Sequence, residues 1–109
     1  MEKITLYYQK SPGLTVSIKL YFTDEDKLML DGYDFGSVVE DLKGKDEYEY
    51  CITVGPDDIK KLYAVFDLHP DDRPGLLDAI RSRFSTNDAF TRFATFMDSK
   101  QIEHSKFFW

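Results

Sequence analysis

Apolar and polar residues alternate through the first half of the chain, and this period of two predicts antiparallel β-strands that bury one face. The clearest run is LTVSIKLYF at residues 14–22, in which every second side chain is apolar. A shorter alternation at residues 4–8 places positions 4, 6 and 8 on the buried face, and the SPG turn at residues 11–13 joins the two runs into a hairpin. Two further strands are expected within KLMLDGY at residues 27–33 and EYEYCITV at residues 47–54.

After Gly55 the apolar residues recur at intervals of three and four, which predicts amphipathic helices. Three helices are expected, each with one apolar stripe. The stripes are formed by Ile59, Leu62, Tyr63 and Phe66, by Leu76, Leu77, Ile80 and Phe84, and by Phe90, Phe93, Ala94 and Met97. The sequence then runs QIEHSKFFW, and its aromatic residues favour a final strand docked on the sheet.

Strands that precede helices predict an α+β fold, with a single domain over residues 1–109. We expect a two-layer sandwich, in which an antiparallel sheet of four N-terminal strands gains a fifth from the C-terminal segment. About three helices would pack on one face of this sheet. The opposite face would stay free of helices. Its expected residues are Tyr7, Lys19, Tyr21, Met29, Tyr33, Glu49 and Cys51.

A Pro-Asp-Asp sequence occurs in GPDDIKKL and again in HPDDRPGL, each time directly ahead of a helical apolar period. Proline suits the first helical position, and aspartates there accept free backbone N–H groups and face the positive end of the helix dipole. We therefore interpret Asp57, Asp58 and either Asp71 or Asp72 as helix-capping residues. A metal shared by the two pairs is disfavoured because a three-turn helix separates them by about 15 Å. Neither a metal nor a cofactor is expected.

Acidic residues concentrate in the middle of the chain. Residues 24–58 contain twelve acids and three lysines, a net charge of −9, whereas the whole chain carries −6. Such a field repels phosphate backbones, so a nucleic acid is not an expected partner, and it attracts a basic protein. The same charge would also keep a small domain in solution.

The single cysteine, Cys51, cannot form an intramolecular disulfide, which excludes a disulfide-stapled fold and fits a reducing compartment. The opening MEKITLYYQK lacks the apolar run of a signal peptide. No stretch approaches the roughly 20 apolar residues of a membrane span. We therefore expect a cytoplasmic protein without membrane contact.

The stretch DGYDFGSVVEDLKGKDEYEY at residues 31–50 is the most distinctive part of the sequence. Gly32, Asp34 and Gly36 suit a tight turn closed by an aspartate side chain. Residues 37–44 indicate either a short helix that ends at a glycine or an irregular excursion, placed between the third and fourth strands.

In this region the chain resembles a family of small bacterial α+β proteins. The shared features are the G-x-D-x-G pattern at residues 32–36, the EYEY that opens a strand at residues 47–50, and a last helix followed by an aromatic strand that ends FFW at residues 107–109. The resemblance covers most of residues 28–109. It implies the α+β fold and no established activity. Small acidic bacterial proteins of this character include immunity proteins that block secreted toxins.

Our first hypothesis is therefore a non-enzymatic protein-binding module of the immunity type, which presents an acidic, tyrosine-bearing surface to a basic partner. Tyrosine offers a rigid contact area with a polar tip, and carboxylates steer a cationic partner toward it. The expected partner-binding residues are Tyr21, Asp31, Tyr33, Asp34, Glu47 and Glu49.

The sequence is also consistent with two other functions. A small hydrolase-like enzyme would use His69 as a general base together with Asp71 or Asp72. A homo-oligomeric structural module would pair an edge strand across a dimer, or dock the C-terminal aromatic residues on a second copy. Those docking residues would be Phe107, Phe108 and Trp109.

Overall fold

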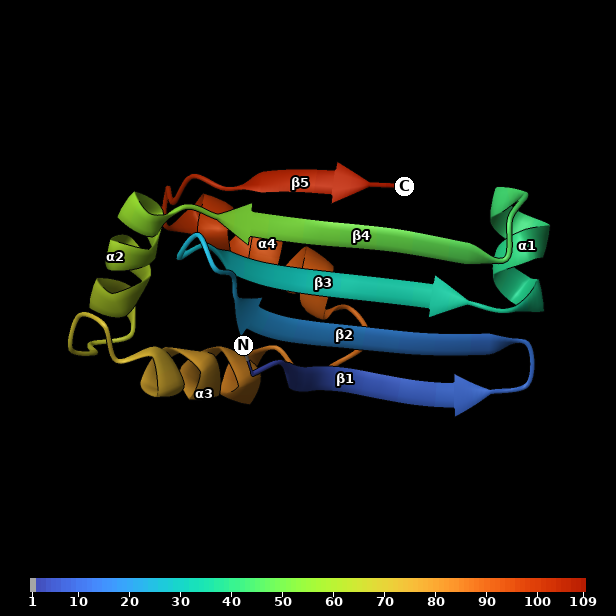
Figure 1. Cartoon of the computed structure of the whole chain (residues 1–109), viewed down its shortest axis with the longest axis horizontal. Helices are drawn as coiled ribbons and strands as arrows, with labels where there is room; N and C mark the ends of the chain where they lie inside the picture. The colour runs from blue at the N-terminus through green and yellow to red at the C-terminus, as the bar shows by residue number, and fades with distance from the viewer. Residues whose placement is uncertain (1) are drawn as a thin grey trace.

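A computed structural model describes residues 2–109 and shows an antiparallel sheet whose five strands follow one another in chain order (Figure 1). The strands are β1 (Ile4–Ser11), β2 (Leu14–Phe22), β3 (Leu28–Phe35), β4 (Glu47–Val54) and β5 (Ser105–Phe108). The helices are α1 (Ser37–Lys43), α2 (Pro56–Val65), α3 (Arg73–Arg83) and α4 (Ala89–Ser99). The predicted α+β sandwich is confirmed, and so is the fifth strand from the C-terminal segment.

The hydrophobic core lies between one face of the sheet, called here the helix face, and the helices α2, α3 and α4. Leu20, Leu30 and Ile52 come from three neighbouring strands, and each is at most 1% exposed. Leu62 of α2 and Phe93 of α4 join the same cluster and are fully buried. In Figure 1, α4 passes behind the sheet, whereas α2 and α3 lie toward one of its ends. Burying one side chain of this size stabilises the fold by about 1.5–3 kcal/mol.

The helix α1 lies at the other end of the sheet, where it connects β3 to β4 (Figure 1). The N–H of Gly36, just before the helix, donates to the carbonyl of Asp46 at 2.8 Å. Gly44 ends the helix in the left-handed conformation, with φ of 80°. The N–H of Val38 donates to the carbonyl of Gly13 at 2.9 Å, so the β1–β2 turn is tied to α1. Of the two possibilities that the sequence leaves for residues 37–44, the structure has the short helix.

A β-bulge in β1 reverses the predicted orientation of two tyrosines. The register between β1 and β2 shifts by one residue between Thr5 and Tyr7, so Leu6 is the extra residue. Leu6 remains buried, Tyr7 packs against the core, and Tyr8 turns to the other face, where it is 60% exposed. The prediction that Tyr8 faces the core and Tyr7 the free face is therefore wrong, because the bulge changes the alternation.

The predicted tight turn at Gly32, Asp34 and Gly36 is also wrong, because β3 continues through the first two of these residues. The ring of Tyr50 from β4 lies across the bare backbone of Gly32, and a Cβ atom there would be 1.9 Å from ring atom Cε2. The Tyr50 hydroxyl donates to the carboxylate of Asp34 at 2.7 Å. On the helix face, Phe90 of α4 meets the Tyr50 ring edge-on, with ring centroids 5.2 Å apart. The glycine thus makes room for a buried tyrosine.

The two Pro-Asp-Asp sequences mark helix starts, as predicted, but they act differently. Asp72 is the N-cap of α3, and its carboxylate accepts the N–H of Gly75 at 3.0 Å. In α2 the N-cap is Gly55, so the capping role expected of Asp57 and Asp58 is wrong. These two aspartates lie in the first turn and pair with lysines three residues later. They still face the positive end of the helix dipole.

Replacing Gly32 with alanine should lower the free energy of unfolding by about 1–3 kcal/mol, the usual cost of overpacking. The new Cβ atom would displace the Tyr50 ring, which breaks its hydrogen bond to Asp34 and its contact with Phe90. Urea unfolding measures the change. Gly55→Ala is the matched control, because a Cβ atom at Gly55 meets open space, and it should cost less than about 1 kcal/mol. Equal losses in the two variants would contradict this role of Gly32.

Candidate functional site

The second face of the sheet has no helix over it within residues 2–109, and we call it the open face (Figure 1). It consists of alternate residues within 15–21 of β2, 29–35 of β3 and 47–53 of β4, with further residues from the two edge strands. Three of its aromatic side chains are strongly exposed: Tyr8 at 60%, Phe107 at 59% and Trp109 at 48%. Exposed apolar surface that is gathered on one face indicates an interaction site.

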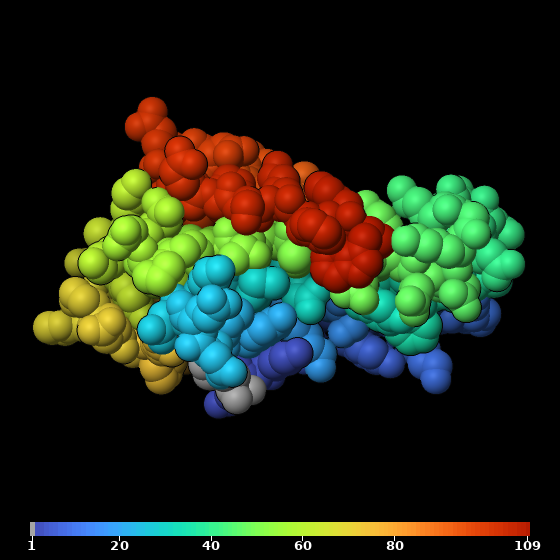
Figure 2. Space-filling model, turned by 45° about the horizontal axis from the view of Figure 1, so that its top comes forward, coloured from blue at the N-terminus to red at the C-terminus, as the bar shows by residue number. Residues whose placement is uncertain are grey.

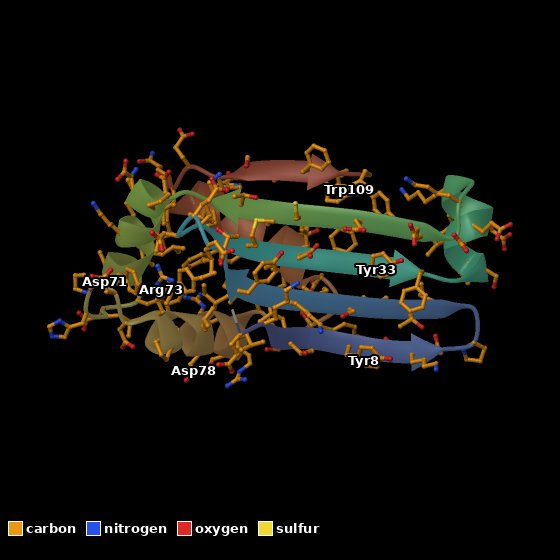
Figure 3. All side chains as sticks on the ribbon, in the orientation of Figure 1. Tyr8, Tyr33, Asp71, Arg73, Asp78 and Trp109 are labelled. Atoms are coloured by element: carbon orange, nitrogen blue, oxygen red, sulfur yellow. The ribbon has the colours of Figure 1, made fainter. Side chains whose placement is uncertain are left out.

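Five residues on the open face line up across the sheet. Tyr8 lies opposite Ser17, and Ser17 lies opposite Tyr33. Tyr33 in turn lies opposite Glu49. Glu49 and Trp109 exchange two backbone hydrogen bonds of 2.9 and 3.0 Å, which adds Trp109 at the end of β5. We call these five residues the transverse row, and Figure 3 shows its aromatic members one above another across the sheet.

The register places two residues of the transverse row between aromatic residues of the flanking strands. Neighbouring strands are about 4.8 Å apart, so residues on alternate strands are separated by about 9.6 Å. Ser17 lies between Tyr8 and Tyr33, and Glu49 lies between Tyr33 and Trp109. We call these two register positions the Ser17 slot and the Glu49 slot. Figure 2 shows the C-terminal residues on the surface of the molecule, close to α1.

The aromatic residues of the Glu49 slot are fixed by their neighbours. Phe35 packs beside Tyr33 with ring centroids 5.2 Å apart, and the Tyr33 hydroxyl donates to the carboxylate of Glu47. This hydrogen bond favours the neutral phenol and raises the pKa of Tyr33 to about 12. On the other side, Phe107 meets Trp109 edge-on with centroids 4.6 Å apart. The rings are therefore held in position by the protein itself.

Charges on the open face are segregated by strand. Asp31, Glu47 and Glu49 lie on β3 and β4, whereas Lys10 and Lys19 lie on β1 and β2. The ion pairs formed within residues 2–109 involve none of the three carboxylates. The β3–β4 half of the open face therefore presents negative charge that the described part of the chain does not neutralise by an ion pair.

Next to the transverse row lies a group of titratable residues with raised pKa values. Burial raises the pKa of Asp31, and the positive charge of Lys3 only partly opposes this effect. Burial also raises the pKa of Cys51, and the charges of Asp31 and Glu49 add to the shift. Cys51 is therefore held as a thiol, which is a poor nucleophile compared with a thiolate. Its place on the open face favours packing rather than catalysis.

The structure brings together five of the six residues predicted for partner binding. They are Tyr21, Asp31, Tyr33, Glu47 and Glu49. The sixth, Asp34, lies on the helix face, where its carboxylate accepts the hydrogen bond from Tyr50 and burial raises its pKa. Asp34 therefore stabilises the β3–β4 pairing and does not contribute to the open face.

Sequence reasoning does not assign three members of the transverse row, Tyr8, Ser17 and Trp109, to the binding site, although it places Ser17 on the correct face. Tyr8 is assigned to the core, because no residue pattern in β1 announces the bulge at Leu6. Trp109 is considered only for self-association, because a short final strand does not reveal which residue of β4 it faces. The aromatic content of the FFW sequence was the one available signal.

The acidic segment at residues 24–58 does not form one patch in space. Asp26 lies near the start of α3 and pairs with Arg73 at 2.6 Å. Asp57 and Asp58 pair with lysines of α2. The carboxylates that remain near the open face are those of β3, β4 and the adjoining α1 end of the sheet. A partner would therefore meet a smaller negative region than the sequence suggests.

The residues expected for a hydrolase-like enzyme, His69, Asp71 and Asp72, lie just before the first turn of α3. His69 is exposed in the α2–α3 loop. Asp72 uses its carboxylate to cap the helix, and Asp71 adopts a left-handed backbone with φ of 69°. Both aspartates thus have local roles in the turn that starts the helix, and these roles explain their positions without catalysis.

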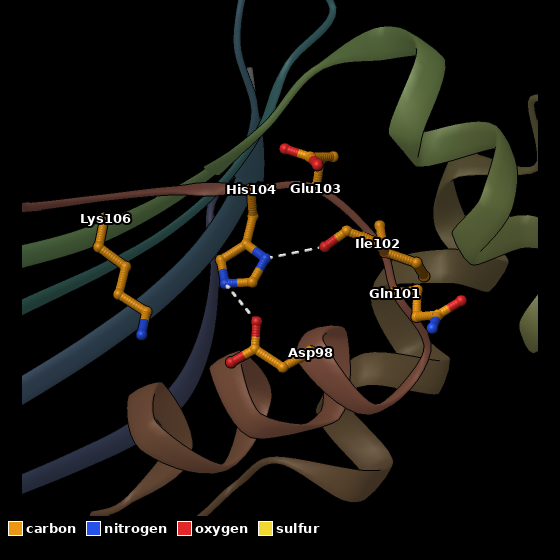
Figure 4. A pocket seen from close by; sticks show the side chains of 6 residues that line it. All are labelled: Asp98, Gln101, Ile102, Glu103, His104 and Lys106. Atoms are coloured by element: carbon orange, nitrogen blue, oxygen red, sulfur yellow. Dashed lines mark hydrogen bonds and ion pairs between the residues drawn. The ribbon is translucent and has the colours of Figure 1, made fainter.

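A second histidine lies beside a carboxylate in a different place. His104 Nε2 is 3.7 Å from Asp98 Oδ1, and His104 Nδ1 is 2.9 Å from the carbonyl oxygen of Ile102 (Figure 4). These residues line an open hollow of about 660 Å³ together with Gln101, Glu103 and Lys106. The His104 side chain is only 6% exposed, and both ring nitrogens face acceptors of the protein. The pair therefore anchors the segment between α4 and β5.

Comparison of the chain with protein-family models, curated proteins and solved structures finds no match. Among residues 2–109, no group of three or more His, Cys, Asp or Glu side chains could hold a metal ion. No helix in the same part of the chain is both long and apolar enough to cross a membrane. The open face is therefore the feature from which a function has to be inferred.

Replacing Glu47 with glutamine should lower the pKa of Tyr33 from about 12 toward the ordinary tyrosine value near 10. The carboxylate is the acceptor that favours the neutral phenol, and an amide removes its charge. A pH titration of ¹³C-labelled tyrosine, followed at the ring carbon that bears the hydroxyl, measures this change. Glu103→Gln removes an exposed carboxylate elsewhere and should leave Tyr33 unchanged. A pKa that stays near 12 in Glu47→Gln would show that Glu47 is not the cause.

Proposed function

We propose that this chain is a non-enzymatic protein-binding module whose open face binds a basic protein, in the manner of an immunity protein that blocks a toxin. The observation that carries the proposal is the transverse row. Its aromatic side chains stand in line across an uncovered sheet, beside carboxylates that form no ion pair within residues 2–109. Aromatic residues on a rigid sheet lose little conformational entropy when a partner covers them.

The size of the open face supports a protein as the partner. The molecule extends 44 × 26 × 21 Å, so its broad face offers on the order of 800 Å², which is the area that each partner contributes to a typical stable interface. Tyrosine and tryptophan are the residues most enriched at the centres of such interfaces. Here they occupy the row that crosses the middle of this surface (Figure 3).

The charge of the open face supports a basic partner. The exposed acids Glu40 and Asp41 of α1, at one end of the sheet, add to the negative charge of Asp31, Glu47 and Glu49. Complementary charge accelerates association and disfavours partners of the same sign, which include nucleic acids. Because lysines lie on β1 and β2, the preference for a basic partner is limited to the β3–β4 half of the open face.

The immunity type rests on the resemblance of residues 32–36 and 47–50 to small bacterial proteins, and on the chain's net charge of −6. The expected cytoplasmic location agrees with this role, because a buried free thiol such as Cys51 is stable in a reducing compartment. A toxin that carries excess positive charge is the class of partner that this surface fits.

A salt-dependent binding experiment with charge-reversed variants tests the proposal. Tagged protein is used to isolate partners from a lysate at low salt, and the retained protein is identified, purified and titrated by calorimetry. We expect a basic protein whose affinity falls as salt is raised. Glu47→Lys combined with Glu49→Lys should weaken its binding at least tenfold, about 1.4 kcal/mol or more, since truncating or reversing interface charges has effects of this size.

The matched control is Asp57→Lys combined with Glu103→Lys, which makes the same change in net charge at exposed positions away from the open face. This control should weaken binding much less than the open-face double variant does, because it acts only through long-range electrostatic repulsion of the basic partner. Equal losses in the two double variants would mean that net charge, and not the open face, attracts the partner. An unchanged affinity in the open-face variant would contradict the proposal.

Self-association is the competing use of the same aromatic residues. Phe107 and Trp109 lie on the open face, whereas Phe108 lies on the helix face against Phe90, with ring centroids 5.6 Å apart. The FFW sequence is thus divided between the two faces and does not form one docking surface. Light scattering that shows a stable dimer, lost when Trp109 is replaced by serine, would favour the homo-oligomeric alternative.

A further inference from the structure

We propose that the Glu49 slot binds the guanidinium group of an arginine side chain that the basic partner presents. This inference rests on the proposed function and names the group that the open face recognises. In the register of the sheet, Glu49 lies between two aromatic residues, Tyr33 and Trp109. A planar cation can stack on the rings while it donates two parallel hydrogen bonds to the carboxylate.

The width of the Glu49 slot suits a flat group. Tyr33 and Trp109 belong to strands on either side of β4, so their backbones are about 9.6 Å apart. A planar group stacked between two rings at the usual contact distances needs about 7–8 Å. Phe35 contacts the Tyr33 ring and Phe107 contacts the Trp109 ring, and these contacts restrict the movement of both rings.

Glu49 is the carboxylate on the open face that is most available to a cation. Glu47 already accepts the hydrogen bond of the Tyr33 hydroxyl. Asp31 already lies near the positive charge of Lys3 and the hydroxyl of Tyr21. Glu49 is half-buried and forms no ion pair with a residue of the described range 2–109. An arginine would supply the counter-charge.

Arginine fits the slot better than lysine. The guanidinium is planar, stacks on aromatic faces and presents paired donors that match a carboxylate, whereas the lysine ammonium is a compact and strongly hydrated charge. The Ser17 slot next to it has the same aromatic spacing but a hydroxyl in place of the carboxylate. The two slots therefore differ mainly in charge, and we expect the cation to bind more tightly at the Glu49 slot.

The chain contains one tryptophan, so the fluorescence of Trp109 reports directly on the slot. The probe is the capped tripeptide acetyl-Gly-Arg-Gly-amide, titrated to about 50 mM, far above a millimolar dissociation constant. Its citrulline and lysine counterparts are titrated at the same ionic strength. We expect a saturable change with the arginine peptide, a weaker one with the lysine peptide, and none with citrulline, which has the same shape without charge.

Glu49→Gln is the decisive variant, because it keeps the size of the side chain and removes its charge. It should weaken binding of the arginine peptide about tenfold, the effect of losing a charge-assisted hydrogen bond. Asp57→Asn, an exposed change on α2, is the matched control and should bind as the unmodified protein does. In a ¹H–¹⁵N spectrum the indole N–H of Trp109 and the amide of Glu49 should shift most.

Three results with the peptides would overturn this inference. They are equal affinity in Glu49→Gln, equal response to citrulline, and no saturable response to the arginine peptide at all. Saturable binding of a neutral oligosaccharide by the same rings, in place of arginine, would also overturn it. If the isolated basic partner still depends on Glu47 and Glu49 while the arginine peptide fails, the proposed function stands and only the arginine assignment falls.

Discussion

The ring of Tyr50 lies across the bare backbone of Gly32, and the rest of the structure depends on this fit between β3 and β4. Any other residue opposite Tyr50 would bring a Cβ atom into the ring. The fit therefore sets the register of the two central strands from the helix face, where the Tyr50 hydroxyl also binds Asp34. Because side chains alternate between faces, the same register pairs Tyr33 with Glu49 on the open face. A packing constraint on one side of the sheet thus positions the candidate site on the other.

The two faces of the sheet contribute in different ways. The helix face holds the fully buried residues that stabilise the domain, such as Leu20, Leu30 and Ile52. The open face holds exposed rings and carboxylates, which contribute little to the core. Tyr33 and Trp109 are steadied by neighbours on their own strands and leave Glu49 between them. This arrangement is rigid before binding, which lowers the entropic cost of recognition.

The sequence predicts the fold well because its patterns are regular. The alternation in residues 14–22 and the helical spacing after Gly55 each specify an element and its buried side, and the structure confirms them. Tyr33, Glu47 and Glu49 are also predicted for the surface, since β3 and β4 keep their alternation without interruption.

The remaining features depend on contacts between strands, which no local pattern records. The bulge at Leu6 moves Tyr8 to the open face, and the register of β5 brings Trp109 opposite Glu49. The sequence alone places Asp34 in a turn, because it does not reveal the hydrogen bond to Tyr50. The transverse row is a property of five strands together, so it becomes visible only in the folded chain.

The central claim is that the exposed aromatic residues of the transverse row serve recognition and not stability. Urea unfolding of the double variant Tyr8→Ser, Trp109→Ser tests it most directly. We expect the free energy of unfolding to fall by no more than about 2 kcal/mol, the sum of two cross-strand contacts. A loss of about 4 kcal/mol or more, as when two core side chains are truncated, would show that these rings hold the fold together and would contradict the claim.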